Sequence, residues 1–219
     1  MVAGTFNGVD GSGFQLNRDL VVANVTGSDY SGAADQILFW NAADSSYTYY
    51  YYYDDGTEAG WSNVVGDEYF EDENPDGLPA GSAFWYLAKD NDATLATTFS
   101  GAVESDDDVT INLTGGKFNM VASAYPTSIQ LNDDNQVEWT NVTGSDYSGA
   151  ADQILFWNAA DSSYTYYYYY DDGSEAGWSN VVGDEYFEDE NPDGLPAGTP
   201  FWYLAKDGTG KAVTFKKTY

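Results

Sequence analysis

The chain has 219 residues, a length that allows two domains of about 110 residues each. Its formal charge of −29, from 36 acidic and 7 basic residues, repels nucleic acid and anionic membranes, so neither is an expected partner. The absence of Cys and His excludes thiol chemistry, histidine bases and the usual zinc sites. All apolar runs are too short to insert into a membrane as a helix, and no signal peptide is predicted.

An internal repeat dominates the sequence. Residues 24–81 return as residues 141–198, shifted by 117 positions, and among these 58 positions only Thr57 differs, from Ser174. A repeat of this length approaches the size of a small domain, so we predict two copies of one unit. The predicted parts are a first domain at 1–103, an acidic linker at 104–108 and a second domain at 109–219.

In chain order, the first unit alternates short apolar runs with clusters of Gly, Asn and Asp. Residues 35–41 (DQILFWN) are apolar on both sides of an extended chain, which predicts a strand buried on both faces. The tyrosine run at 47–53 follows a turn-length segment, and together they predict a β-hairpin. Later strands are expected at 60–65, 84–89 and 93–103.

The second unit begins at 109–113, where Val, Ile and Leu alternate with Thr and Asn, the pattern of a half-buried strand. A strand is also expected at 118–124, and the repeated stretch follows. No window of useful length shows helical periodicity. The predicted fold is therefore all-β, with two tandem β-sandwich or small-barrel domains from an internal duplication.

The two units are not equally complete at their starts. Residues 120–122 (MVA) align with residues 1–3, but the stretch at 109–119 has no counterpart ahead of the first unit. We therefore expect the first unit to lack its opening strand. The consequence is an unpaired sheet edge, or a gap filled by residues that processing has removed.

Three segments of the second unit carry a distinctive pattern, with the tyrosine run between the last two. They are 116–126 (GKFNMVASAYP), 152–157 (DQILFW) and 195–203 (LPAGTPFWY). The pattern resembles a repeat of secreted bacterial proteins of the Verrucomicrobia and Planctomycetes type, and it extends over most of both units. The acidic insert at 183–194 departs from it. The resemblance implies an extracellular β-rich domain without a particular activity.

An Asp-x-Asn-x-Asp-Gly motif in each unit has the oxygen ligands and the tight-turn glycine of the first half of a calcium loop. Ala83 or Pro200 stands where an EF-hand needs Glu, so a carboxylate from elsewhere would complete the site. The alternative is a solvated acidic turn, with the charge serving solubility or adaptation to salt. The predicted calcium ligands are Asp72, Asn74, Asp76, Leu78, Asp189, Asn191, Asp193 and Leu195. The candidate completing carboxylates are Glu68, Glu71, Asp54, Asp55, Glu58, Glu185, Glu188, Asp171, Asp172 and Glu175.

The tyrosine run places rings on both faces of its strand, and only one face can cover the core of its own domain. The other face is expected at a protein contact or stacked on a ligand, with cross-strand pairing as the alternative. Trp40 and Trp85 lie in apolar runs and are expected in the core, whereas Trp61 and its copy Trp178 are expected at the surface. The candidates for interface or ligand stacking are Tyr49, Tyr51, Tyr53, Trp61, Tyr166, Tyr168, Tyr170 and Trp178.

These features favour an extracellular structural subunit that assembles with copies of itself into a filament, sheath or surface layer. The contact between the two units is expected to repeat head-to-tail between chains, helped by strand complementation and by calcium. The lysines at 211, 216 and 217 are expected to meet an acidic surface of the next copy. The alternative is a carbohydrate-binding or adhesive module that stacks Trp and Tyr rings on cell-surface glycans. No catalytic motif is recognisable, so no enzymatic activity is expected.

Overall fold

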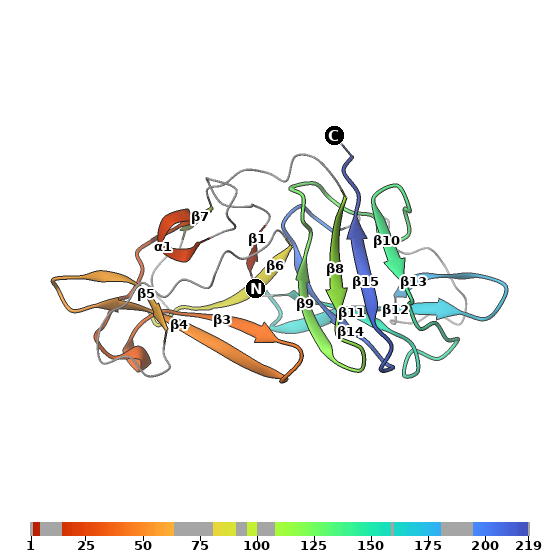
Figure 1. Ribbon diagram of the computed structural model, residues 1–219, viewed down its shortest axis with the longest axis horizontal. Helices are drawn as coiled ribbons and strands as arrows, with labels where there is room; N and C mark the ends of the chain where they lie inside the picture. Colours follow the sequence, from red (N-terminus) through yellow and green to blue (C-terminus); the bar gives the residue numbers. More distant parts are fainter. Residues whose placement is uncertain are drawn as a thin grey trace.

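In a computed structural model, the chain folds almost entirely into antiparallel β-sheets, which confirms the predicted all-β class (Figure 1). The structure describes residues 2–4, 15–63, 81–90, 96–99, 108–158, 160–180 and 195–218. Within these ranges, helical structure is confined to two short turns, α1 (Leu16–Asp19) and the 3-10 helix η1 (Ser31–Ala33). Such short turns leave no periodic pattern in a sequence, so the sequence does not predict them.

The first half contains one large sheet and one pair of strands. The strands are β1 (Val2–Gly4), β2 (Leu20–Ala23), β3 (Gln36–Asn41), β4 (Ser46–Asp54), β5 (Ala59–Asn63), β6 (Ser82–Leu87) and β7 (Ala96–Phe99). The large sheet has the order β1-β6-β3-β4-β5, and β2 pairs with β7.

The second half repeats this arrangement and adds one strand. Its strands are β8 (Val109–Leu113), β9 (Phe118–Ala122), β10 (Val137–Thr140), β11 (Gln153–Asn158), β12 (Ser163–Asp171), β13 (Ala176–Asn180), β14 (Pro200–Leu204) and β15 (Lys211–Phe215). The large sheet has the order β9-β14-β11-β12-β13, which matches the order in the first half, and the small sheet has the order β10-β15-β8. In Figure 1, β8 and β15 of the small sheet run across β11 and β12 of the large sheet.

The predicted tyrosine hairpin is present in both halves, as β3–β4 and β11–β12. In the first half the register places Ile37 opposite Tyr50. In the connecting turn, the side-chain oxygen of Asn41 accepts the Ala43 N–H at 3.0 Å, and Ser45 adopts a φ of 52°. An Asn that bonds the backbone two residues on is a common turn device, so local chemistry sets the hairpin.

The other strands lie close to their predicted positions. The predicted half-buried strand at 109–113 is β8, in which Ile111 and Leu113 turn inward while Thr110 and Asn112 are exposed. The strand predicted at 84–89 lies slightly earlier, as β6, and the described part of the strand predicted at 93–103 is β7. Alternation of apolar and polar residues is therefore a reliable guide in this chain.

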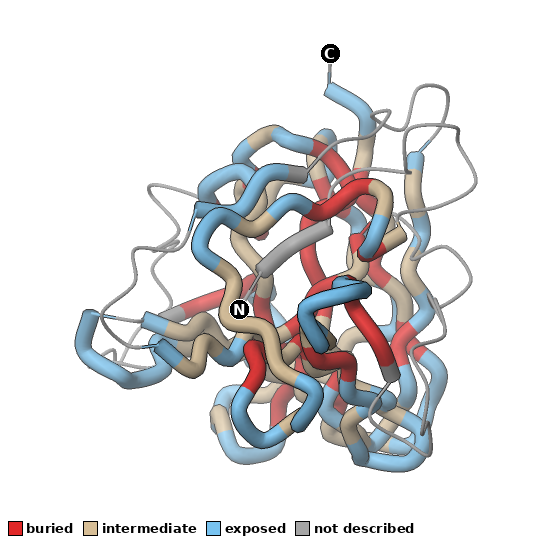
Figure 2. The backbone as a smooth tube through the Cα atoms, turned by 90° about the vertical axis from the view of Figure 1, so that its left-hand side faces the viewer, coloured by how far each residue is buried: buried red, intermediate tan, exposed pale blue. Residues whose placement is uncertain are grey.

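Each half has its own core. Figure 2 shows that the buried residues lie mainly in the interior of the molecule, among the strands. In the second half the core lies between the two sheets and is centred on Ile154, Phe201, Tyr203, Val213 and Phe215. In the first half the buried cluster consists of Leu16, Leu20, Ile37, Tyr50, Trp61 and Phe84. Aromatic rings therefore supply much of the apolar area that is removed from water.

The prediction that Trp61 and Trp178 lie at the surface is wrong, because their exposed fractions are 2% and 0%. The Asn17 side chain holds the Trp61 backbone: it accepts the Trp61 N–H at 2.6 Å and donates to the Trp61 carbonyl at 2.9 Å. Asn132 does the same for Trp178, at 2.7 and 3.0 Å. The neighbouring Ser62 is also buried, so the small residue beside the ring marks close packing instead of exposure.

Asn132→Ala is expected to lower the free energy of unfolding by about 1–3 kcal/mol, because it leaves the buried backbone of Trp178 without its partners. Asn112→Ala, on the exposed side of β8, is the matched control and should stay within about 0.5 kcal/mol of the wild type. Urea denaturation followed by tryptophan fluorescence measures both. Equal midpoints for the two variants would contradict the role of Asn132.

Candidate functional site

The contact between the two halves is built around four tryptophans. Trp40 of β3 meets Trp202 of β14, with ring centroids 5.4 Å apart and planes at 86°. Trp157 of β11 meets Trp85 of β6, at 6.0 Å and 77°. Trp157 is the copy of Trp40, and Trp202 aligns with Trp85, so each half offers the same patch to the other. The contact is therefore self-complementary, as in a two-fold symmetric dimer.

A self-complementary contact closes on itself, and this one is already made within the chain; its head-to-tail repetition between chains stays a prediction. Tyr47 lies near its own copy Tyr164, as residues close to a two-fold axis do. Burial raises the pKa of the Tyr47 phenol, and the Tyr164 phenol adds to this rise. Trp40 and Trp85, expected in the cores, are half-buried at this junction because the apolar second face of their strands lies there.

The junction is not fully symmetric, because β9 extends further than β1. Three hydrogen bonds depend on the β9 region: Trp40 Nε1 to the Phe118 carbonyl at 2.7 Å, Lys117 Nζ to Ser45 Oγ at 3.1 Å, and the Ala122 N–H to the Gly81 carbonyl at 2.9 Å. Beside them a groove of about 260 Å³ is lined by Trp40, Phe118, Leu155, Tyr164 and Trp202. Its walls are mainly aromatic and apolar.

The tyrosine strands have one core face, as predicted. On β4, Tyr50 is 5% exposed and Tyr52 packs against the same cluster. On the opposite face Tyr49 is 37% exposed, whereas Tyr51 is buried and packs along the strand against Tyr53, with ring centroids 6.3 Å apart. The corresponding residues of β12 are half-buried: Tyr166, Tyr168 and Tyr170. The outer face is therefore partly covered by its own rings.

Most of the predicted calcium ligands lie outside the described residues, namely Asp72, Asn74, Asp76, Leu78, Asp189, Asn191 and Asp193. Leu195 is described, and its carbonyl accepts the Ile129 N–H at 2.9 Å. Asp55 accepts the Thr57 hydroxyl at 2.6 Å, and this bond, with the Glu58 and Thr57 N–H groups, holds the pKa of Asp55 well below its usual range. In the described ranges, no group of three or more carboxylates could hold a metal ion. Calcium binding stays a prediction.

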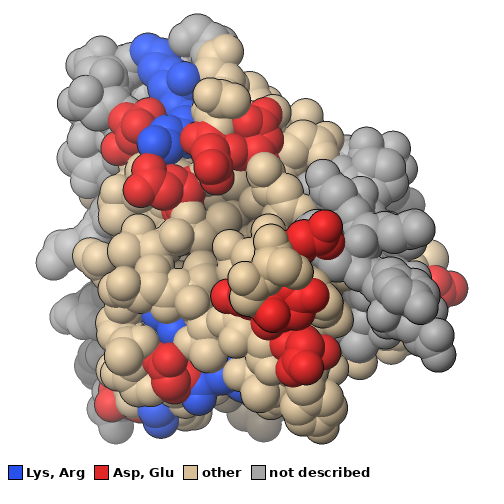
Figure 3. Space-filling model, turned by 90° about the vertical axis from the view of Figure 1, so that its right-hand side faces the viewer, with Lys and Arg blue, Asp and Glu red and all other residues tan. Residues whose placement is uncertain are grey.

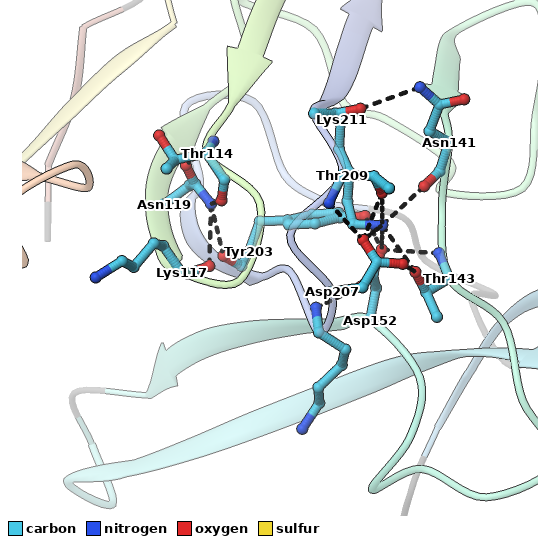
Figure 4. A network of polar contacts seen from close by, with 12 residues as sticks. Thr114, Lys117, Asn119, Asn141, Thr143, Asp152, Tyr203, Asp207, Thr209 and Lys211 are labelled. Atoms are coloured by element: carbon cyan, nitrogen blue, oxygen red, sulfur yellow. Dashed lines mark hydrogen bonds and ion pairs between the residues drawn. The ribbon is translucent and has the colours of Figure 1, made fainter.

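The second half encloses an ionic centre, shown in Figure 4. The Asp152 carboxylate accepts hydrogen bonds from the Thr143 N–H at 2.9 Å, the Tyr203 hydroxyl at 2.6 Å and the Lys206 N–H at 2.8 Å. Lys211 Nζ lies 3.3 Å from the same carboxylate, and both side chains are buried. Burial and the charge of Asp152 raise the pKa of Tyr203, so its phenol keeps its proton and donates.

Lys211 is fully engaged within its own domain. Its Nζ lies 3.2 Å from Asp207 and donates to the Asn141 carbonyl and the Thr143 hydroxyl, both at 2.8 Å. The expectation that Lys211 meets a neighbouring copy is therefore wrong. A residue near the C-terminus looks exposed in the sequence, but β15 is the central strand of its sheet, and this position buries the lysine.

The two lysines that follow also have acidic neighbours. Lys216 Nζ lies 2.7 Å from Glu138, and this hydrogen bond raises the pKa of Lys216. The Asp108 carboxylate accepts the backbone N–H of Lys217 at 3.1 Å. On the face shown in Figure 3, basic side chains are accordingly flanked by acidic ones.

The first half repeats the buried carboxylate without the lysine. Asp35 is 0% exposed and accepts the Thr26 N–H at 3.1 Å, the Tyr86 hydroxyl at 2.6 Å and the Lys89 N–H at 2.7 Å. Burial, followed by the hydrogen bond to Asp35, raises the pKa of Tyr86. Within the part of the chain that the structure describes, no Lys or Arg side chain pairs with Asp35.

The two small sheets differ at one edge. In the second half β15 pairs with β10 on one side and with β8 on the other, where the Thr110 and Thr214 hydroxyls lie 2.8 Å apart. β7, which aligns with β15, pairs with β2 alone among the described strands. β8 likewise pairs with β15 alone in the same ranges. Among the described strands, one edge of β7 and one edge of β8, on different halves of the molecule, thus have no strand paired to them.

Comparison with models of known families, with curated proteins and with solved structures finds no match to this chain. Among the described residues, no helix is both long and apolar enough to cross a membrane.

The two tryptophan pairs predict a specific coupling energy. In a double-mutant cycle, Trp40→Ala and Trp202→Ala are expected to couple by about 0.5–1.5 kcal/mol, because the edge-to-face contact is lost only once. Trp40→Ala combined with Trp139→Ala, a ring in the core of the second half, should be additive within about 0.5 kcal/mol. Urea denaturation gives the free energies of unfolding of the four proteins in each cycle. Additivity of Trp40 and Trp202 would show that the rings do not hold the halves together.

Asp207→Asn is expected to reduce the loss of stability in acid. Hydrogen bonds from the side chains of Thr143 and Thr209 hold the pKa of Asp207 well below its usual range. Such a carboxylate stabilises the fold above its unfolded pKa, about 3.9, and this contribution disappears as pH falls through the lower folded value. Denaturation midpoints between about pH 5 and pH 2 should fall less for the variant than for the wild type. The exposed Asp146→Asn should follow the wild type, and equal slopes for all three would refute the prediction.

Proposed function

We propose that this protein is an extracellular structural subunit that associates with copies of itself by strand addition, β8 of one copy covering the free edge of β7 in the next. The observation that carries the proposal is the difference between the two small sheets. β15 is covered on both sides, whereas β7 is covered only by β2 among the described strands. A free edge presents unpaired N–H and C=O groups, which favour pairing with another strand.

β8 has the side chains to cover β7, because it already covers the aligned strand β15. In that pair Thr110 lies opposite Thr214, and Val109 lies opposite Phe215. β7 carries Thr98 and Phe99 at the corresponding positions, and its residues 96–98 are exposed. A strand keeps the same alternation of side chains whichever edge it pairs through, so Thr110 and Val109 stay on opposite faces when β8 pairs through its other edge.

The proposed pairing joins two different parts of the chain. Such a heterologous contact leaves one free edge at each end of the assembly, so its repetition gives an open filament. The tryptophan junction closes within each chain and does not compete for these edges. The tryptophan junction then holds the two halves of one subunit together, and the pairing of β8 with β7 links one subunit to the next.

Repulsion between copies that each carry a charge of −29 opposes association, so assembly is expected to strengthen with salt. Calcium at the predicted Asp-x-Asn-x-Asp-Gly loops would reduce the same repulsion. An extracellular setting supports this role, because extracellular modules bind calcium in the 10⁻⁴–10⁻³ M range as an order of magnitude. Carbohydrate binding is the weaker candidate, because Trp61 and Trp178 are buried and cannot stack on a glycan.

A strand supplied within the chain tests the proposal. In the test variant a second copy of residues 109–119 is fused ahead of Met1, the place that this segment occupies before Met120. The extra strand should cover β7, so the variant should stay monomeric where the wild type forms oligomers. A fusion of the same residues in shuffled order is the control and should associate like the wild type.

Sedimentation velocity over a wide range of protein concentration, at physiological salt with calcium, measures the three proteins. A wild type that stays monomeric at every concentration would overturn the proposal. So would a fusion with residues 109–119 that associates as strongly as the shuffled control.

A further inference from the structure

The second half shows how a cation fits beside the buried aspartate. The Lys211 ammonium lies 3.3 Å from Asp152 and 2.8 Å from both the Asn141 carbonyl and the Thr143 hydroxyl. These three oxygen-bearing residues belong to the repeated stretch. Their counterparts in the first half are Asp35, Asn24 and Thr26.

The first half has the oxygen-bearing residues of this site but lacks a counterpart of Lys211. Lys211 directly precedes Ala212, the first residue of β15 that pairs with β10, opposite Thr140. In the first half Ala96 pairs with the corresponding residue of β2, and the residue before it is Leu95. Leu95 lies outside the described residues, but a leucine carries no charge in any position.

Asp35 therefore presents an electrostatic problem. Its carboxylate is fully buried and receives three hydrogen bonds, from the backbone of Thr26 and Lys89 and from the Tyr86 hydroxyl. All three partners donate, so the carboxylate acts only as an acceptor toward them. An ionised group in the interior is costly unless an opposite charge lies nearby, and the described part of the chain places no Lys or Arg there.

We propose that the first half binds a monovalent cation of the size of ammonium or potassium beside Asp35, in the position that Lys211 Nζ fills in the second half. The Asp35 carboxylate and the Thr26 hydroxyl supply oxygen ligands, and the Asn24 carbonyl completes the set by correspondence with Asn141. Hard cations take oxygen ligands of these kinds. A single positive charge is proposed because the equivalent site holds a single ammonium group, that of Lys211, beside Asp152 and Asp207. The proposal is independent of strand addition and of the predicted calcium loops.

Thermal unfolding in potassium chloride and in tetramethylammonium chloride, at equal ionic strength and with a chelator of divalent ions, tests the site. The two salts screen surface charge equally, but tetramethylammonium is too large for the position of an ammonium group. The wild type should melt about 3–6 °C higher in potassium at a tenfold excess over its Kd. Leu95→Lys supplies the charge within the chain, so this variant should lose the difference between the salts.

Three further variants separate the site from general effects of charge. Leu87→Lys adds the same charge at a residue that is 44% exposed and should keep the potassium effect, as should the neutral Leu95→Met. Lys211→Met leaves Asp152 without its cation and should enlarge the potassium effect. Equal melting temperatures of the wild type in the two salts would overturn the proposal. A potassium effect that survives in Leu95→Lys would overturn it as well.

Discussion

A buried aspartate at the start of the hairpin is the interaction on which each half depends. The backbone of Asp35 bonds the Thr26 carbonyl at 2.8 Å and the Tyr52 N–H at 2.9 Å, while its carboxylate reaches Tyr86 and Lys89. One residue thus joins the loop before β3, the tyrosine strand, β6 and the segment after β6. Because a buried carboxylate is stable only when donors surround it, these four segments must meet in one arrangement. Asp152 makes the same contacts in the second half.

The aspartate also explains how the two halves can differ around an identical centre. In the second half Lys211 of β15 pairs with the aspartate, whereas the aligned residue of the first half is an uncharged leucine, Leu95. The same half has the two-stranded sheet, in which β7 is covered on one side among the described strands. Both differences lie in the sequence that flanks the repeated stretch. The repeated stretch therefore supplies the β3–β4–β5 and β11–β12–β13 strands and one tryptophan of each junction pair, and the flanking segments supply the other strands and the features in which the halves differ.

Features that depend on short-range patterns of residues can be predicted from this sequence. The alternation in β8 and the hairpin of β3 and β4 follow from local side-chain order and turn chemistry, and both are present. The burial of Trp61 depends on Asn17, 44 positions away, and no local pattern announces that contact. The pairing of Trp40 with Trp202 requires the orientation of one half against the other, which a repeat in the sequence does not specify. The expectation that Lys211 is exposed is wrong for a similar reason, since its burial follows from the position of β15 between two other strands.

We propose that copies of this chain meet at the free edge of β7. Hydrogen exchange of the β7 amides, followed by mass spectrometry at increasing protein concentration, examines this edge directly. The account predicts that exchange in β7 and β8 slows as the concentration rises, while exchange in the two large sheets stays the same. Oligomers that form without any slowing in β7 would place the contact elsewhere and contradict the account.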